Sequence, residues 1–258
     1  MSTGSARSRQ PTKQEISPPP TKRGAVRPTD LNGDARLDAV VVNRNGNTLS
    51  VLMNKGSATW DTPQTVNTPS LPAGIAVGDI NKDGRSDVLV SGYQDGIVQA
   101  FINNGSGALT PSGQGTMVGS GPSGVSLFDF NKDGILDVAT VCENAGGVSV
   151  LLGQTGGAFA SGQTYSTGTF PSMALAEDLN GDGRADLIVL NGGSKGSLIV
   201  LPGQGDGTFV SGESSQRIAL NFSPSAFSAV DMDGDGKLDL AVVSQSGNKA
   251  IILRNQSR

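Results

Sequence analysis

The chain has 258 residues, a formal net charge of −4 and no histidine, so Ser–His and Cys–His catalysis would lack its base. Its single cysteine, Cys142, excludes an intrachain disulfide, and covalent cross-links therefore cannot stabilise the fold. No apolar run approaches the roughly 18 residues of a membrane-spanning helix, and the 37 glycines indicate many tight turns.

The N-terminal residues 1–23 combine Ser, Pro, Lys and Arg with almost no apolar content. We expect residues 1–10 to form a disordered leader, because such a composition cannot bury enough apolar surface to fold. No aromatic or amphipathic pattern accompanies the basic residues, so we expect neither a nucleic-acid partner nor membrane insertion.

From residue 24 onward, one unit of about 50 residues recurs, and its centre is a nine-residue acidic loop. The loops begin at Asp30, Asp79, Asp129, Asp178 and Asp231, with spacings of 49, 50, 49 and 53 residues. They contain sixteen of the 23 acidic residues. Carboxylates at this density repel one another unless a cation neutralises them.

Strand signals surround each loop. A short apolar run leads into it, and a proline stands seven residues before the first Asp in four repeats. The runs that follow are apolar at consecutive positions, which is typical of strands covered on both faces: 39–42, 88–90, 138–141, 187–190 and 240–243. A third strand follows a Gly/Asn/Ser turn, and a weaker fourth strand ends four of the repeats.

This order predicts an all-β protein, a β-propeller of five four-stranded antiparallel blades. We place residues 11–258 in the propeller, with repeats at 24–73, 74–123, 124–172, 173–225 and 226–258. The fifth repeat ends after its third strand, so we expect residues 11–17 to add its fourth strand and close the ring.

The acidic loops have the composition of metal sites. Positions 1, 3, 5 and 9 carry Asp or Asn, and the backbone carbonyl of position 7 can add another oxygen. An all-oxygen, mostly anionic cage suits Ca²⁺ better than Zn²⁺ or Mg²⁺. The candidate ligands are Asp30, Asn32, Asp34, Arg36 and Asp38; Asp79, Asn81, Asp83, Arg85 and Asp87; Asp129, Asn131, Asp133, Ile135 and Asp137; Asp178, Asn180, Asp182, Arg184 and Asp186; and Asp231, Asp233, Asp235, Lys237 and Asp239.

Position 6 separates the first loop from the others. It is glycine in four loops but Ala35 in the first, which we therefore expect to be the weakest of up to five calcium sites. An EF-hand is excluded, because position 12 is valine or threonine where that motif needs a bidentate glutamate. The alternative is that the loops are Asp-Gly and Asn-Gly turns that hold no metal.

The unit V/L-x-x-D-x-N-x-D-G-x-x-D-L-x-V, with a glycine-rich stretch ending in phenylalanine about 20 residues later, resembles the FG-GAP/VCBS repeat. The second part is clearest at 150–159 and 200–209. This repeat builds integrin α-subunit propellers and many bacterial secreted or surface proteins. The resemblance implies a calcium-binding propeller in which positions 1, 3, 5, 7 and 9 hold the ion. Since complete rings in that family commonly have seven blades, this chain is alternatively part of a larger ring.

We therefore expect a calcium-stabilised extracellular or cell-surface scaffold for binding or adhesion, with a protein or glycan ligand. A lectin-like site between blades is the alternative, although Trp60, Tyr93 and Tyr165 leave few aromatic platforms for sugars. A hydrolase is the weakest hypothesis, and we expect no enzyme activity. The G-x-S-x-G string at 192–196 lies in a turn between strands rather than before a helix.

Overall fold

The computed structural model describes residues 25–212 and 215–256, and these residues form an all-β protein. The short 3-10 turn η1 spans Arg44–Gly46. No helix in this part of the chain has the length and apolar character needed to span a bilayer.

Five antiparallel sheets follow one another along the chain. The first has the order β1 (Val26–Thr29), β2 (Asp38–Asn43), β3 (Thr48–Leu52) and β6 (Gln64–Asn67). The second contains β7 (Pro72–Gly78), β8 (Asp87–Gly92) and β9 (Ile97–Asn103), and both β10 (Leu109–Pro111) and β11 (Thr116–Met117) pair with β9.

The third sheet contains β12 (Pro122–Phe128), β13 (Asp137–Cys142), β14 (Gly147–Leu151) and β17 (Gln163–Ser166). The fourth contains β18 (Pro171–Glu177), β19 (Asp186–Asn191), β20 (Ser197–Leu201) and β21 (Gln216–Ala219). The fifth has three described strands, β22 (Ala226–Val230), β23 (Asp239–Ser244) and β24 (Lys249–Leu253). Two small hairpins lie outside these sheets. They are β4–β5 (Asn54–Gly56 and Thr59–Trp60) and β15–β16 (Gly153–Gln154 and Ala158–Phe159).

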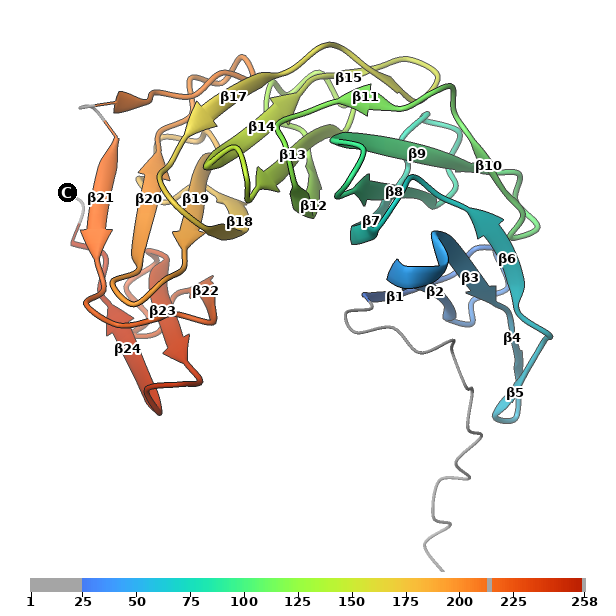
Figure 1. The fold of residues 1–258 in the computed structure, drawn as a ribbon, viewed down its shortest axis with the longest axis horizontal. Coiled ribbons are helices and arrows are strands. Elements are labelled where there is room, and N and C mark those ends of the chain that lie inside the picture. Colours follow the sequence, from blue (N-terminus) through green and yellow to red (C-terminus); the bar gives the residue numbers. More distant parts are fainter. Residues whose placement is uncertain (1–24, 213–214, 257–258) are drawn as a thin grey trace, which may run out of the picture.

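The sheets stand side by side along an arc, with the first and fifth at its two ends (Figure 1). The first strand of each sheet lies on the inner side of the arc, and the last strand lies on the outer side. The predicted all-β class and the antiparallel four-stranded units are confirmed. The predicted fourth strand of the last unit falls on residues 11–17, outside the described residues, so ring closure and blade number stay predictions.

The cores lie between neighbouring sheets. Every residue of β8, β13 and β19 is buried, which confirms that their consecutive apolar positions are covered on both faces. The equivalent strands at the two ends of the arc, β2 and β23, each contain partly exposed positions. Burial of the second strand on both faces thus depends on a neighbouring sheet on each side.

A hairpin after the third strand supplies part of each core. Leu109 packs in a cluster with Leu31 of the preceding repeat, and Phe159 packs in the same way with Ile80. The ring of Phe209 lies 5.3 Å from that of Phe130 in an edge-to-face arrangement. The second, third and fourth repeats therefore each seal the core of the repeat before them.

Candidate metal-binding loops

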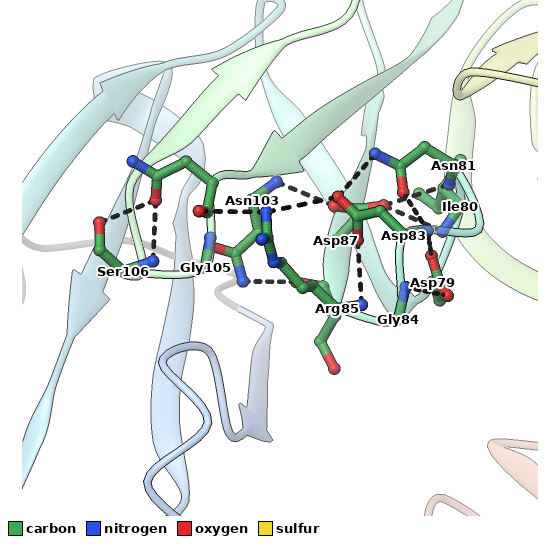
Figure 2. Close-up of polar contacts among 12 residues, drawn as sticks. Asp79, Ile80, Asn81, Asp83, Gly84, Arg85, Asp87, Asn103, Gly105 and Ser106 are labelled. Carbon is green, nitrogen blue, oxygen red and sulfur yellow. Dashed lines mark hydrogen bonds and ion pairs between the residues drawn. The ribbon is translucent and has the colours of Figure 1, made fainter.

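Each acidic loop connects the first strand of a sheet to the second, so all five loops lie at the same end of their sheets. In the second repeat, β7 ends at Gly78, and the loop runs from Asp79 to the beginning of β8 at Asp87. Figure 2 shows this loop, in which the side chains of Asp79, Asn81 and Asp83 turn inward on the loop's own backbone. The antiparallel pairing of β7 and β8 thus determines where the predicted ligands lie.

The first carboxylate organises the turn. Asp79 Oδ1 accepts the N–H of Asp83 at 3.0 Å, and Asp79 Oδ2 accepts that of Gly84 at 2.8 Å (Figure 2). The other four loops repeat contacts of this kind. Burial raises the pKa of Asp30, yet the surrounding backbone N–H groups together lower it below its ordinary value. The N–H groups of Gly236 and Gly234 likewise lower the pKa of Asp231, so the charged forms of these two carboxylates are favoured.

Positions 3 and 5 form a second layer of contacts. Asn81 Oδ1 accepts the N–H of Asp83 at 3.0 Å, and the Asn81 amide donates to Asp83 Oδ2 at 3.0 Å. Asp83 Oδ1 in turn accepts the N–H of Arg85 at 3.0 Å. The first, third and fourth loops repeat this arrangement. The side-chain oxygens of positions 1, 3 and 5 are therefore already held in one turn by hydrogen bonds.

The carboxylate at position 9 has a role that the sequence analysis missed. Asp87 is fully buried, with Oδ2 accepting the N–H of Ile80 at 3.0 Å and Oδ1 accepting that of Asn103 at 2.8 Å. The same two contacts occur in every repeat. This residue therefore joins the loop to the end of the third strand. The sequence signal for this role is the Asp that begins the second strand in every repeat, but that signal does not identify the partner at the end of the third strand.

Burial has an electrostatic cost at this position. Desolvation raises the pKa of Asp87, Asp137 and Asp186, and the backbone N–H donors only partly offset it. The carboxylates at positions 1 and 5 raise the pKa of Asp137 and Asp186 further. A cation placed among these groups would favour their charged forms.

The structure brings three carboxylates together most closely in the fifth loop. Oxygen atoms of Asp231, Asp233 and Asp239 all lie within 4.8 Å of one another, and no other such group of three occurs among the described residues. In the other loops an asparagine stands at position 3, and its amide group donates to the carboxylate at position 5. Asp235 lies outside this group of three, and its Oδ1 accepts the N–H of Lys237 at 2.9 Å.

Basic side chains lie next to some loops and not others. Arg36 pairs with Asp34, Arg85 lies 3.7 Å from Asp83, and Arg254 lies 3.3 Å from Asp233. Within residues 25–212 and 215–256, no ion pair involves a carboxylate of the third or fourth loop. The Lys132 ammonium of the third loop instead donates to the Gly183 carbonyl of the fourth.

The turn needs a left-handed backbone at two positions. Position 6 has φ between 79° and 84° at its four glycines, and Ala35 adopts φ 61° in the first loop. Position 4 is also left-handed in every loop, including φ 63° at Lys82 and 61° at Lys132. Ala35 thus keeps the common turn at a strain of about 1–2 kcal/mol. The sequence predicted the left-handed backbone at position 6, but the left-handed backbone at position 4 was not predicted.

The oxygen donors of these loops could hold a hard divalent cation, because they include carboxylates and amide oxygens but no nitrogen or sulfur ligand. The position-7 residues differ in their side chains, and the proposed ligand there is the backbone carbonyl. The side chains of Arg36 and Arg85 donate instead to the carbonyls of Asn54 and Asn104. The arginines therefore tie the loop to the following hairpin.

Three solved structures resemble this chain in fold. The BBS1N chain of a BBS1N–ARL6DN complex matches with a TM-score of 0.55 and 17% identity, over 91% of this chain and 66% of its own. A Bacteroides uniformis protein, provisionally assigned as a 6-phosphogluconolactonase, matches with a TM-score of 0.56 and 15% identity, over 85% of this chain and 64% of its own. The V. cholerae biofilm matrix protein Bap1 matches with a TM-score of 0.51 and 17% identity, over 91% of this chain and 38% of its own.

These likenesses show a propeller-like repeat fold, and the chain spans less than two thirds of each of these longer structures. No curated protein sequence matches it. The model of the FG-GAP-like repeat matches four times, at residues 30–90, 82–140, 129–189 and 178–242, and each match begins at or near an acidic loop. The chain therefore belongs to the FG-GAP-like repeat family.

Proposed function

We propose that this protein is a calcium-stabilised scaffold for extracellular or cell-surface binding. One observation carries the proposal: the same turn, with oxygens at positions 1, 3 and 5 and a buried carboxylate at position 9, occurs in all five repeats. Repetition of an anionic turn is costly unless a ligand common to all the turns offsets the repulsion. Ca²⁺ fits the donor set, and it is most abundant outside cells.

The calcium ion would add ionic links between the turn and the beginning of the second strand, where hydrogen bonds now hold the two together. Positions 1, 3 and 5 belong to the turn, whereas position 9 begins the second strand and contacts the end of the third. Bound calcium would hold the turn against the sheet edge. A rigid row of sheets could then present loops at its opposite end to a partner.

We propose a binding role rather than catalysis. The support is chemical: the chain contains no histidine, and its carboxylates are concentrated in loops where backbone N–H groups already engage them. For the ligand we propose a protein or glycan, with no nucleic acid and no membrane insertion, in accord with the net charge of −4.

Calcium titration by calorimetry, with the bound ions counted per chain, tests the proposal. We expect dissociation constants of about 10⁻⁴–10⁻³ M, the range of extracellular modules. At about 1 mM free ion, one site of about 10⁻⁴ M adds roughly 1.4 kcal/mol of stability. Excess chelator should therefore lower the melting temperature by several degrees, and an unchanged melt with no bound calcium would refute the proposal.

A pair of variants separates the loops from general charge effects. Asp182→Asn removes a charge from the fourth loop, and Asp61→Asn removes one from a surface pair with Lys55. We expect Asp182→Asn to reduce the number of bound ions by one and Asp61→Asn to leave it unchanged. Equal calcium binding by the two variants would show that the loops are not the sites.

A further inference from the structure

The end of the sheets opposite the acidic loops contains a cavity of about 260 Å³. Six residues line it: Arg44, Ala73, Tyr93, Ser123, Glu143 and Ser172. They come from the first four sheets, so the cavity spans several repeats. A second hollow of about 250 Å³, along the inner strands, shares Ala73, Ser123 and Ser172 with it.

Three of the lining residues occupy the same position of the repeat. Arg44, Tyr93 and Glu143 each follow directly after the second strand of their sheet, which ends at Asn43, Gly92 or Cys142. The position at the other end of that strand is Asp in every repeat. The second strand therefore begins with the same residue, Asp, in every repeat, at the end of the sheets that carries the acidic loops. Its opposite end is followed by a cation, a phenol and an anion in the first three repeats.

The two charges lie on either side of the tyrosine. The Arg44 guanidinium lies 4.8 Å from the centre of the Tyr93 ring, and Tyr93 Oη lies 3.4 Å from Glu143 Oε2. Both charged residues are half-buried, and neither forms an ion pair with any residue that the structure describes. Opposite charges kept apart in a partly desolvated cavity are complementary to a ligand that carries both charges.

One further feature lies in this cavity, and another lies two residues from its lining. The hydroxyl oxygen of Ser123 is buried and has no hydrogen-bond partner among the described residues, and such groups are rare in native structures. Phe170, two residues before Ser172, is 67% exposed and has φ 58°. A left-handed, exposed aromatic residue costs free energy in the isolated chain, and such strain is concentrated at binding sites.

From this constellation we propose that the cavity binds a small zwitterion, a molecule with one carboxylate and one ammonium group. Arg44 binds the carboxylate, Glu143 binds the ammonium group, and the Tyr93 and Ser123 hydroxyls contribute hydrogen bonds. The inference goes beyond the proposed function, because it adds a small-molecule site to the protein or glycan ligand proposed above. It does not require calcium binding, because the cavity and the acidic loops lie at opposite ends of the sheets.

The test is calorimetric titration of the calcium-saturated full chain with 4-aminobutyrate and 6-aminohexanoate. Butyrate and butylamine are the single-charge controls, and glucuronate probes an acidic sugar. We expect at least one amino acid to bind and each single-charge control to bind at least about tenfold more weakly. Binding of glucuronate above both amino acids, equal binding of the single-charge controls, or no binding of either amino acid would overturn the proposal.

Charge-neutral variants identify the site. Arg44→Gln and Glu143→Gln should each weaken amino-acid binding by about tenfold or more, because each removes one ionic partner. Lys195→Gln, a charge change in the exposed turn between β19 and β20, should leave it unchanged. Melting curves confirm that each variant is folded, and equal affinities in all three would place the binding elsewhere. Since calcium titration of the same proteins is a separate measurement, failure here leaves the metal proposal standing.

Discussion

The junction between the third and fourth sheets and that between the fourth and fifth are built from the same kind of repeat, but among the described residues only the first is sealed by an aromatic side chain of the following hairpin. Phe209 is 5% exposed, packs edge-to-face on both Phe130 and Tyr165, and donates its N–H to Tyr165 Oη at 3.1 Å. At the second junction, the equivalent of Phe130 is Leu179, which lines a cavity of about 350 Å³.

The difference follows from where the sealing residue comes from. Leu31, Ile80 and Phe130 occupy position 2 of their loops and are at most 3% exposed, and each packs with a residue from the next repeat. The described residues of the fifth repeat include no hairpin after β24, and so no counterpart of Phe209. The fifth repeat contacts Leu179 through the Asn255 amide, which donates to the Leu179 carbonyl at 2.6 Å, and leaves the side chain partly exposed. Repeats of similar sequence therefore differ in how completely their cores are covered, according to their neighbours.

The largest expected effect comes from removing the seal. Phe209→Ala should lower the free energy of unfolding by about 3–5 kcal/mol, because it leaves a cavity beside Phe130 and Tyr165. Phe170→Ala, which removes an exposed ring, should change it by less than about 0.5 kcal/mol. Urea unfolding curves of both variants make the measurement. Similar losses would mean that Phe209 does not seal the junction.

Thiol labelling compares the opening of the two regions directly. Cys142 is buried at the end of β13, and Ser244 occupies the matching position of β23. With Cys142 replaced by alanine, a Ser244→Cys variant should react with a thiol reagent at least about tenfold faster than Cys142 does, because the fifth sheet is less covered.

Burial also raises the pKa of the Cys142 thiol and so lowers its thiolate fraction at neutral pH. Labelling in urea is therefore the control, since both thiols should then react at the same rate. Equal labelling rates in the native proteins would contradict the difference between the junctions.

Filling the open junction should have a smaller effect. Leu179→Phe places a larger side chain where Phe130 stands in the sealed repeat, and we expect it to raise the free energy of unfolding by up to about 1 kcal/mol. The reverse change, Phe130→Leu, should lower it by about 1–2 kcal/mol. Thermal melts of the pair test whether the cavity accepts the ring. Destabilisation by Leu179→Phe would mean that the cavity cannot take the larger side chain.

The smallest effect concerns a loop distant from both junctions. Ala35→Gly should relieve the left-handed strain in the first loop, and the gain of up to about 1 kcal/mol is limited by the added freedom of the unfolded chain. Gly84→Ala in the second loop should cost about 1–2 kcal/mol, because φ there is 83°. Calcium titrations of both variants also test whether the first loop is the weakest site.

Much of the architecture could be predicted because it is local. The proline that begins β7, the consecutive apolar residues of β8 and the acidic loop between them all recur at fixed spacing, and each indicates its own conformation. The loop residues were predicted for the same reason, although calcium binding stays a prediction. The second role of Asp87 was missed, because its partner Asn103 lies 16 residues away across the sheet.

The sequence by itself determined the repeat, the strands and the oxygen-rich turns, since these depend on residues close together in the chain. Only the tertiary structure decided which side chains seal a core, as Phe209 does, and which charged residues line the same cavity, as Arg44 and Glu143 do. These contacts and this shared cavity join residues of different repeats. Their energies depend on burial and distance, which arise only when the sheets pack against one another.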